Sequence, residues 1–315
     1  MGDREFRRGT PPVCIADGKP EAAPEPLLDV AEAVRGGWIE LWYQPKVDAR
    51  ALAMRGAEAL LRFRHPAWGI VPPSYVMPND GSPIFHPLSE SVIRRAIEDW
   101  HYFFAKRGPV ETAINLPIAF LQDSESFSRL RKLIPDDPAF NGLIVEINGT
   151  EIVRNLKLAK ELASELRKHK IAISVDELGA EWLQLAGVCN FPFVELKVDR
   201  KFIAGCAEDR LKQSICRRIV ELADSYGART VADGVENWAD FHAVREIGFD
   251  LAQGALFAEP MSAERFAQTS WAGAQACPPS PRPSSRVELG FTSYQPHPLS
   301  DRRERQVTLL RPSRD

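Results

Sequence analysis

One carboxylate stands in an apolar run that has the composition of a buried strand. Glu58 lies between Ala57 and Ala59, and the run continues through two leucines to Arg62. Burying an unpaired carboxylate costs several kcal/mol, so Glu58 must face a cation, a metal or a ligand. A buried ion pair with Arg62 or Arg64 is one solution, and a binding site is the other.

Polar side chains recur at or near the ends of nearly all the β-rich segments. They are Gln44, Glu58, Asn115, Glu146, Asp176 with Glu177, Lys197, Asp233 and Gln253. A hydrogen-bonded strand end or a helix cap explains any one of them taken alone. If they meet, their five carboxylates would repel strongly unless cations lie among them, which indicates hard divalent metals with oxygen ligands. A pair of such metals suits the attack of water on a phosphodiester.

These residues come from short strands that alternate with amphipathic helices. The strand candidates are 39–44, 57–63, 112–115, 143–146, 171–176, 193–198, 230–233 and 251–253, and helical spacing covers 90–106, 150–169, 206–226 and 238–247. Eight strands alternating with helices predict an α/β fold, a closed (β/α)₈ barrel of the TIM type. The carboxyl ends of its strands converge on one mouth, so the polar residues would meet there.

Composition narrows the class of protein. The chain has 315 residues, 44% of them apolar and 26% charged, which suits one large domain or two small ones. A net charge of −3 gives no broad reason to bind nucleic acid or an anionic membrane. No apolar run reaches the length of a membrane span, and we expect a cytoplasmic protein. The five scattered cysteines show no CxxC spacing, so neither a disulfide framework nor a zinc site is indicated.

The two ends of the chain differ from its centre. Residues 1–26 carry proline, glycine and charge without apolar periodicity, which predicts a flexible leader. Residues 27–270 carry the alternating pattern and form the predicted barrel domain. Residues 271–315 are rich in proline, serine and arginine, which predicts a disordered tail because such a segment buries too little apolar surface to offset its ordering entropy.

Seven short motifs, in order along the barrel region, resemble those of EAL domains. They are Tyr43–Pro45, Glu58–Arg62, Asn115–Leu116, Val145–Ile147, Leu196–Arg200, Gly234–Glu236 and Leu251–Gly254. The resemblance implies a modified (β/α)₈ barrel, often dimeric, that binds cyclic di-GMP. Active members of the family use Mg²⁺ or Mn²⁺ to hydrolyse this nucleotide to linear pGpG.

The resemblance also implies roles for individual residues. Glu58, Asn115, Glu146 and Asp176 match the ligands of a first metal, and Glu177 matches a second-metal ligand. Lys197 matches the catalytic lysine, and Asp233 and Glu236 are assigned to the catalytic group. Arg62 matches a contact to the ligand's phosphate, and Gln44 and Gln253 match positions near the ligand.

The chain departs from the family pattern around the second metal. Glu177 stands in place of an aspartate and Asp233 in place of a glutamate. The loop 178–184, which closes over the substrate in active relatives, is largely rewritten, and Gly149 replaces the glutamate that holds it. Glu151 is the nearest substitute, so the loop is expected to be mobile or held in another way. We therefore predict an intact first metal site, a doubtful second one, and hydrolysis that is slow or lost.

Three functions follow as hypotheses. The chain is a slow metal-dependent phosphodiesterase, a receptor that binds cyclic di-GMP without turnover and signals to a protein partner, or an interaction module that no longer binds the nucleotide. The first-metal set argues against the third, because a scaffold has no need for converging carboxylates. Homodimer formation stays open because the loop that contributes to that interface is altered.

Overall fold

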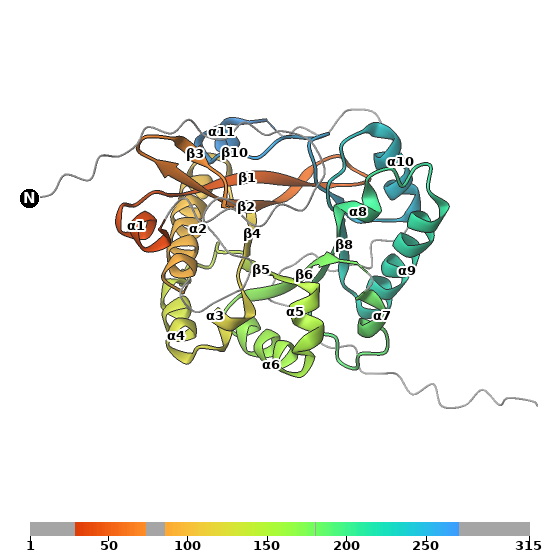
Figure 1. Ribbon diagram of the computed structural model, residues 1–315, viewed down its shortest axis with the longest axis horizontal. Coiled ribbons are helices and arrows are strands. Elements are labelled where there is room, and N and C mark those ends of the chain that lie inside the picture. Colours follow the sequence, from red (N-terminus) through yellow and green to blue (C-terminus); the bar gives the residue numbers. More distant parts are fainter. Residues whose placement is uncertain (1–28, 74–85, 180, 271–315) are drawn as a thin grey trace, which may run out of the picture.

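The computed structural model describes residues 29–73, 86–179 and 181–270 as a closed ring of eight strands wrapped in helices (Figure 1). The strands of the ring are β1 (Ile39–Asp48), β2 (Met54–His65), β4 (Glu111–Asn115), β5 (Leu143–Asn148), β6 (Ile171–Leu178), β7 (Glu195–Val198), β8 (Arg229–Ala232) and β9 (Leu251–Ala252). The predicted barrel is confirmed, and all eight predicted segments contribute a strand. The predicted leader and tail lie outside the described residues.

One strand runs against the others. β1 pairs antiparallel with both β2 and β9, whereas every pairing from β2 round to β9 is parallel. Gln44 lies opposite Glu58 in the β1–β2 ladder, so their side chains share one face. The expectation that the polar residues lie at strand ends is wrong for these two, since both stand in the middle of long strands. Two short strands, β3 (Gly69–Val71) and β10 (Met261–Ser262), pair with β2 and β1 outside the ring.

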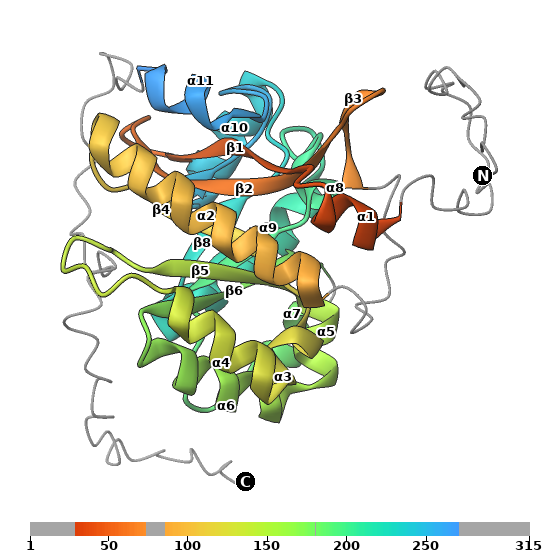
Figure 2. The same cartoon turned by 90° about the vertical axis from the view of Figure 1, so that its left-hand side faces the viewer.

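Helices cover the outside of the ring (Figure 2). They are α1 (Val30–Arg35), α2 (His86–Arg107), α3 (Ile118–Gln122), α4 (Ser124–Leu133), α5 (Gly149–Arg154), α6 (Leu156–Arg167), α7 (Trp182–Leu185), α8 (Arg200–Ile203), α9 (Arg210–Tyr226), α10 (Trp238–Ile247) and α11 (Ala263–Gln268). α10 has the predicted bounds. The helix predicted over 150–169 is divided at Asn155, and α9 begins after Asp209, whose side chain caps it.

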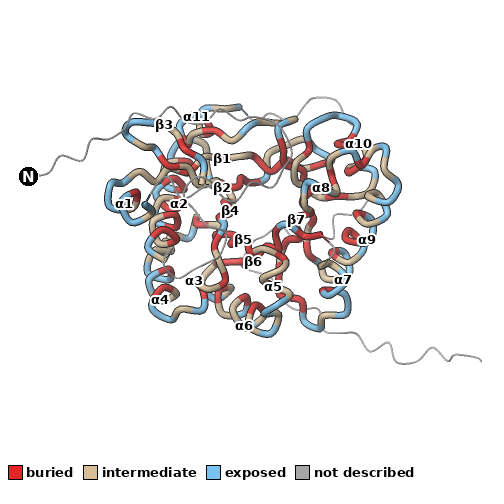
Figure 3. The backbone as a smooth tube through the Cα atoms, viewed as in Figure 1, coloured by how far each residue is buried: buried red, intermediate tan, exposed pale blue. Residues whose placement is uncertain are grey.

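Burial follows the pattern expected of a barrel with amphipathic helices. Buried residues lie along the strands and on the helix faces turned toward them (Figure 3). α2 packs on β1 and β4, α6 on β6, and α9 on β7 and β8. Several charged side chains are buried inside the ring as well, where aliphatic residues usually fill such barrels. These charges form the candidate site and the layer beneath it.

Candidate active site at the barrel mouth

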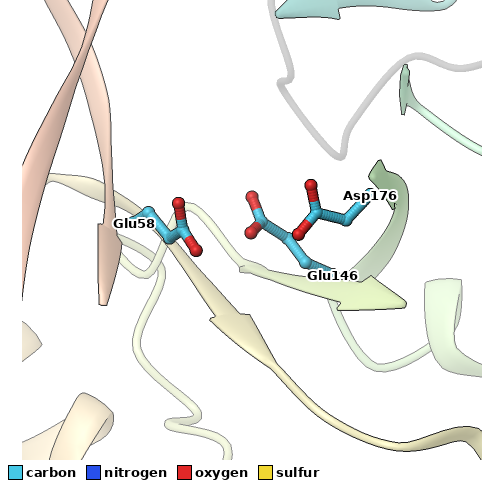
Figure 4. Close-up of side chains that lie close together, drawn as sticks. All are labelled: Glu58, Glu146 and Asp176. Atoms are coloured by element: carbon cyan, nitrogen blue, oxygen red, sulfur yellow. The ribbon is translucent and has the colours of Figure 1, made fainter. Parts of the chain in front are cut away.

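Three carboxylates from three strands converge at one end of the ring. Glu58 on β2, Glu146 on β5 and Asp176 on β6 each offer an oxygen within 4.8 Å of the other two, and their carboxylate groups face one another (Figure 4). The three residues are only 4%, 1% and 9% exposed. The barrel therefore brings together three of the four predicted ligands of the first metal as a compact buried cluster.

A lysine on the neighbouring strand β7 lies among these acids. The Nζ atom of Lys197 lies 2.7 Å from Glu58 Oε2, 3.3 Å from Glu146 Oε2, 3.4 Å from Asp176 Oδ1 and 3.8 Å from Asp233 Oδ2. One ammonium group thus faces four carboxylates. Because the local charge stays negative, the cluster favours a further cation.

The ion-pair partner first considered for Glu58 was wrong. Arg64 pairs with Glu40 and is largely exposed, and Arg62 donates from Nη1 to the carbonyl oxygen of Leu61. Arg62 and Arg64 are four and six positions along β2 from Glu58, on the same face but too far along the strand to reach it, so a partner from across the barrel takes their place. That partner is Lys197, 139 positions away.

The pKa values of the site residues are shifted by burial and by the crowding of negative charge. Burial raises the pKa of Glu146 to about 8, and the charge of Glu58 adds to this effect. Burial likewise raises the pKa of Asp176 to about 6. Burial also opposes ionisation of Glu58, but the charge and hydrogen bond of Lys197 outweigh it and lower the Glu58 pKa to about 2. The pKa of Lys197 rises well above its usual value because the surrounding carboxylates outweigh its own desolvation.

Three amide side chains complete the surroundings of Glu58. Asn115 Nδ2 donates to Glu58 Oε1 at 2.8 Å, which leaves the amide oxygen of Asn115 as a donor atom for a cation. Gln253 Nε2 lies 2.6 Å from Glu58 Oε2 and 3.1 Å from Gln44 Oε1. Gln44 in turn donates to the carbonyl oxygen of Ala258. The two glutamines, predicted to lie near the ligand, therefore also hold the Glu58 carboxylate in place.

The residues predicted for a second metal are arranged differently. Glu177 Oε2 accepts a hydrogen bond from Asn148 Nδ2 at 2.5 Å, and its backbone has a φ of +50°, which is uncommon for a residue with a side chain. Glu177 does not belong to the three-carboxylate cluster. Asp233 reaches the cluster only through its 3.8 Å contact with Lys197, and burial raises its pKa.

Glu236 lies apart from these residues. It forms an ion pair with Arg200 in which both side chains are largely exposed, and it does not line the pocket described below. Its assignment to the catalytic group stays a prediction that the geometry of the described residues does not support.

The loop after β6 is held by a contact that the sequence did not suggest. Glu151 does not substitute for the missing loop anchor, because its Oε2 accepts a hydrogen bond from the Ile118 amide. Instead Glu181, inside the loop, accepts from the Gly179 amide at 3.1 Å and from the Thr150 hydroxyl on α5 at 3.5 Å. These contacts are consistent with a loop held in another way, and the alternative of a mobile loop stays a prediction.

A pocket of about 890 Å³ opens above the acid cluster. Glu58, Asp176 and Lys197 line it, together with Asn115, Glu177, Asp233 and both glutamines, whereas Glu146 lies behind them and is not part of the lining. Two basic residues, Arg62 and Arg154, lie in its wall beside apolar residues such as Leu88 and Val92. The size and the mixture of apolar walls with a few converging polar groups suit a small-molecule ligand, and the two arginines suit an anionic one.

Two further charged residues of the site were missed by sequence reasoning. Lys46 on β1 and Glu195 at the start of β7 are buried directly beneath Glu146. The available signal was the one used for Glu58, a single charge inside an otherwise apolar strand, as in Pro45-Lys46-Val47 and Val194-Glu195-Leu196.

The fold and the donor set define a TIM-type barrel whose mouth fits a hard divalent cation, since carboxylate and amide oxygens are the ligands that Mg²⁺ and Mn²⁺ prefer. The EAL domain model matches residues 28–260, and the chain belongs to this family, whose relatives include cyclic di-GMP phosphodiesterases.

Relatives of known sequence agree with this assignment. The chain is 31% identical to the cyclic di-GMP phosphodiesterase PA2567 of Pseudomonas aeruginosa over 232 residues, which cover 72% of this chain and 39% of that protein. It is 29% identical to the cyclic di-GMP phosphodiesterase RocR of the same organism, over 76% of this chain and 62% of that protein. The matches thus span less than two thirds of either relative.

A solved structure supports the fold. The PaMucR phosphodiesterase in its c-di-GMP complex superposes with a TM-score of 0.67 and 27% identity, over 75% of this chain and 97% of that one.

Among the residues that the structure describes, no helix has both the length and the apolar character needed to cross a membrane.

Proposed function

We propose that this chain binds cyclic di-GMP in the pocket at the barrel mouth, together with Mg²⁺ or Mn²⁺, and hydrolyses it slowly or not at all. One observation carries the proposal: three buried carboxylates converge on Lys197, and two of them line, with Lys197, a pocket that has two arginines in its wall. The relatives named as cyclic di-GMP phosphodiesterases, and the solved complex with that nucleotide, supply the substrate class.

The chemistry of each side chain suggests a different role in the site. Glu58, Glu146, Asp176 and the amide oxygen of Asn115 would hold the first metal. When bound, such a metal stabilises negative charge on a phosphate and makes water a better nucleophile at neutral pH.

Two cationic side chains would act on the ligand directly. Lys197, already held by four carboxylates, would keep a positive charge beside the phosphate that is attacked. Arg62 would orient the ligand from the pocket wall, because its planar fork of donors matches a phosphate. Both side chains thus position charge before any reaction begins.

Slow turnover is proposed from the second-metal residues. Glu177 is one methylene longer than the family's aspartate and is hydrogen-bonded to Asn148, and Asp233 is one methylene shorter than the family's glutamate. A shift of one C–C bond, about 1.5 Å, is enough to matter. A misplacement of about 1 Å can cost on the order of 100-fold in rate. The charges needed for a second cation are therefore present, but on side chains of altered reach.

A receptor without turnover is the second candidate. The same observations on Glu177 and Asp233 favour it, because binding requires the first metal and the pocket whereas hydrolysis requires all of the site. In that case the binding of cyclic di-GMP would be signalled to a protein partner.

A homodimer, which the family resemblance implies, stays a prediction that sedimentation of the purified chain would test.

One set of measurements separates the candidates. The purified chain is incubated with cyclic di-GMP and Mn²⁺ or Mg²⁺ while pGpG is followed by chromatography, and binding is measured by calorimetry in Ca²⁺. Formation of pGpG that is lost in Glu58→Ala supports hydrolysis, and binding without pGpG supports the receptor. Absence of binding contradicts both and leaves the interaction module.

The matched control is Glu221→Ala. Glu221 is an exposed acid on α9 that pairs with Arg218 and does not belong to the pocket lining. The Glu221→Ala variant removes the same type of side chain as Glu58→Ala, and it should change neither the binding of cyclic di-GMP nor the formation of pGpG.

A further inference from the structure

A row of alternating charges continues from the acid cluster into the interior of the barrel. Lys46 Nζ lies 2.7 Å from Glu146 Oε1 and 2.6 Å from Glu195 Oε1. Glu195 Oε2 lies 2.9 Å from Arg229 Nη2, and Arg229 also pairs with Glu111. These residues come from β1, β4, β5, β7 and β8, so the row crosses the ring from its mouth to the starts of β4, β7 and β8.

The middle of this row is sealed from solvent. Lys46 and Glu146 are 1% exposed and Glu195 is 0% exposed, whereas the side chains of Arg229 and Glu111 at the far end are 18% and 13% exposed. Ser174 donates a further hydrogen bond to Glu195 at 3.1 Å. Each buried charge therefore has a partner on either side.

Lys46 makes the two oxygens of Glu146 unequal. Oε1 is held by Lys46, and Oε2 faces Lys197, which also contacts Glu58 and Asp176. Rotation of the Glu146 carboxylate would break the contact with Lys46 and leave a buried ammonium group with a single partner. Such an uncompensated buried charge is strongly unfavourable, so the orientation of Glu146 is fixed from beneath.

Stability is a weak reason to build such a row. Ion pairs buried in a barrel often contribute no more than well-packed apolar side chains of the same volume. The row of charges does fix the direction of one carboxylate oxygen of Glu146, which an apolar core could not do.

We propose that Lys46 and Glu195 are positioning residues of the metal site: Glu195 anchors Lys46, and Lys46 holds Glu146 Oε1 so that Oε2 is presented to the metal. The inference rests on the proposed function, because it assumes that Glu146 ligates a divalent cation. Residues that orient metal ligands from behind commonly change metal affinity 10- to 100-fold when they are removed.

The test compares two double variants that each remove one positive and one negative charge from the same row. Lys46→Met with Glu195→Gln removes the pair beneath Glu146. Arg229→Met with Glu111→Gln removes the pair at the far end and keeps Lys46 between its two acids. Binding of Mn²⁺ without nucleotide is measured by calorimetry, and the melting temperature of each variant is recorded.

We expect the first double variant to bind Mn²⁺ about 10- to 100-fold more weakly than the parent chain, and the second to stay within about 3-fold of it. Equal weakening in both variants would show that the row only stabilises the barrel, and would overturn the proposal. Unchanged Mn²⁺ affinity in the first variant would overturn it as well.

Two further outcomes of the experiment also decide the proposal. If the first double variant does not fold, Glu195→Ala alone decides, since it keeps Lys46 but removes its anchor: weakened Mn²⁺ binding by a folded protein supports the proposal, and parental binding overturns it. If the parent chain itself binds no Mn²⁺, the proposed metal site is wrong and this inference falls with it. Parental binding that the variants leave unchanged removes this inference alone.

Discussion

The two halves of the barrel mouth are built in different ways. Glu58, Glu146 and Asp176 stand on strands of the ring, are nearly inaccessible to solvent, and share one lysine. In the other half Glu177 is exposed and hydrogen-bonded to the start of a helix, and the side chain of Asp233 is 32% exposed. The first half is fixed by the register of the sheet, whereas in the second half Glu177 lies where the β6–β7 register shifts and Asp233 lies just after β8.

This difference bears on the departures that the family resemblance implies around the second metal. A substitution in the first half would leave a buried charge without its partner, so it would disturb the barrel as well as the site. A substitution at Glu177 or Asp233 changes the reach of a side chain that is in contact with solvent, at little cost to the fold. Chemistry at the second half can therefore change while the barrel stays intact.

The largest effect is expected from Lys197→Met in the absence of metal. It leaves four carboxylates facing one another, so we expect the free energy of unfolding to fall by about 3–5 kcal/mol. Mn²⁺ at 100 times its dissociation constant should recover about 2.7 kcal/mol. Urea unfolding with EDTA and with Mn²⁺ measures both quantities.

Lys201→Met is the matched control for this variant. Lys201 pairs with Asp199 nearby, but its side chain is 61% exposed. Its removal should change stability by no more than about 1 kcal/mol, with no dependence on Mn²⁺. Similar losses in the two variants would mean that the first half of the mouth is not held by Lys197.

The second prediction concerns catalysis by the other half. Glu177→Asp combined with Asp233→Glu returns both side chains to the lengths found in the family, and we expect pGpG formation to rise on the order of 100-fold. Binding of the first metal should stay unchanged, because neither residue belongs to the buried cluster. A double variant with parental turnover would place the lesion elsewhere.

Adding Gly149→Glu to this pair is expected to reverse part of the gain. A Cβ atom at position 149 would lie 3.2 Å from the carbonyl oxygen of Asp176 and 3.4 Å from Val175 Cγ1. The backbone that carries a metal ligand would have to shift. The triple variant should therefore bind Mn²⁺ more weakly than the double variant in calorimetry.

The sequence predicted the elements of the fold better than the contacts between them. Strand segments, α10 and the converging acids could be found because apolar periodicity and strand-end polarity are local signals. The pairing of Lys46 with Glu195 joins residues 149 positions apart. Such a contact depends on which side chains meet across the closed ring, and local patterns carry no information about these pairings.

The antiparallel first strand shows the same limit. A barrel of alternating strands and helices predicts parallel neighbours, but β1 and β2 follow one another through a short turn and pair antiparallel. Glu58 consequently reaches the mouth from the middle of a strand, opposite Gln44. The type of residue at position 58 indicated a buried site, but the partners of Glu58 could be identified only from the fold.

A smaller effect is expected at Asn148, which joins the two halves. Its Oδ1 accepts from the Thr150 amide and caps α5, while its Nδ2 donates to Glu177. Asn148→Ala should lower the free energy of unfolding by about 0.5–2 kcal/mol through loss of the cap. Asn148→Asp keeps the cap but loses the donor, so it should lower stability less while still releasing Glu177.

Chemical denaturation of both variants measures the cap, and hydrogen exchange at the Glu177 and Leu178 amides measures the release of that segment. We expect faster exchange in both variants. Faster exchange in Asn148→Ala alone would show that the cap, and not the contact with Glu177, orders the segment.

The smallest effect is expected at the loop itself. Glu181→Gln keeps the length of the side chain but weakens its two hydrogen bonds, to the Gly179 amide and the Thr150 hydroxyl. At about 0.5–1.5 kcal/mol for each bond, the Gly179 amide should exchange a few-fold to about tenfold faster, with global stability nearly unchanged. Glu151→Gln, which weakens the bond to the Ile118 amide, should leave exchange in this loop as it is. If Glu151→Gln loosens the loop and Glu181→Gln does not, the sequence-based choice of Glu151 as the substitute anchor would be correct.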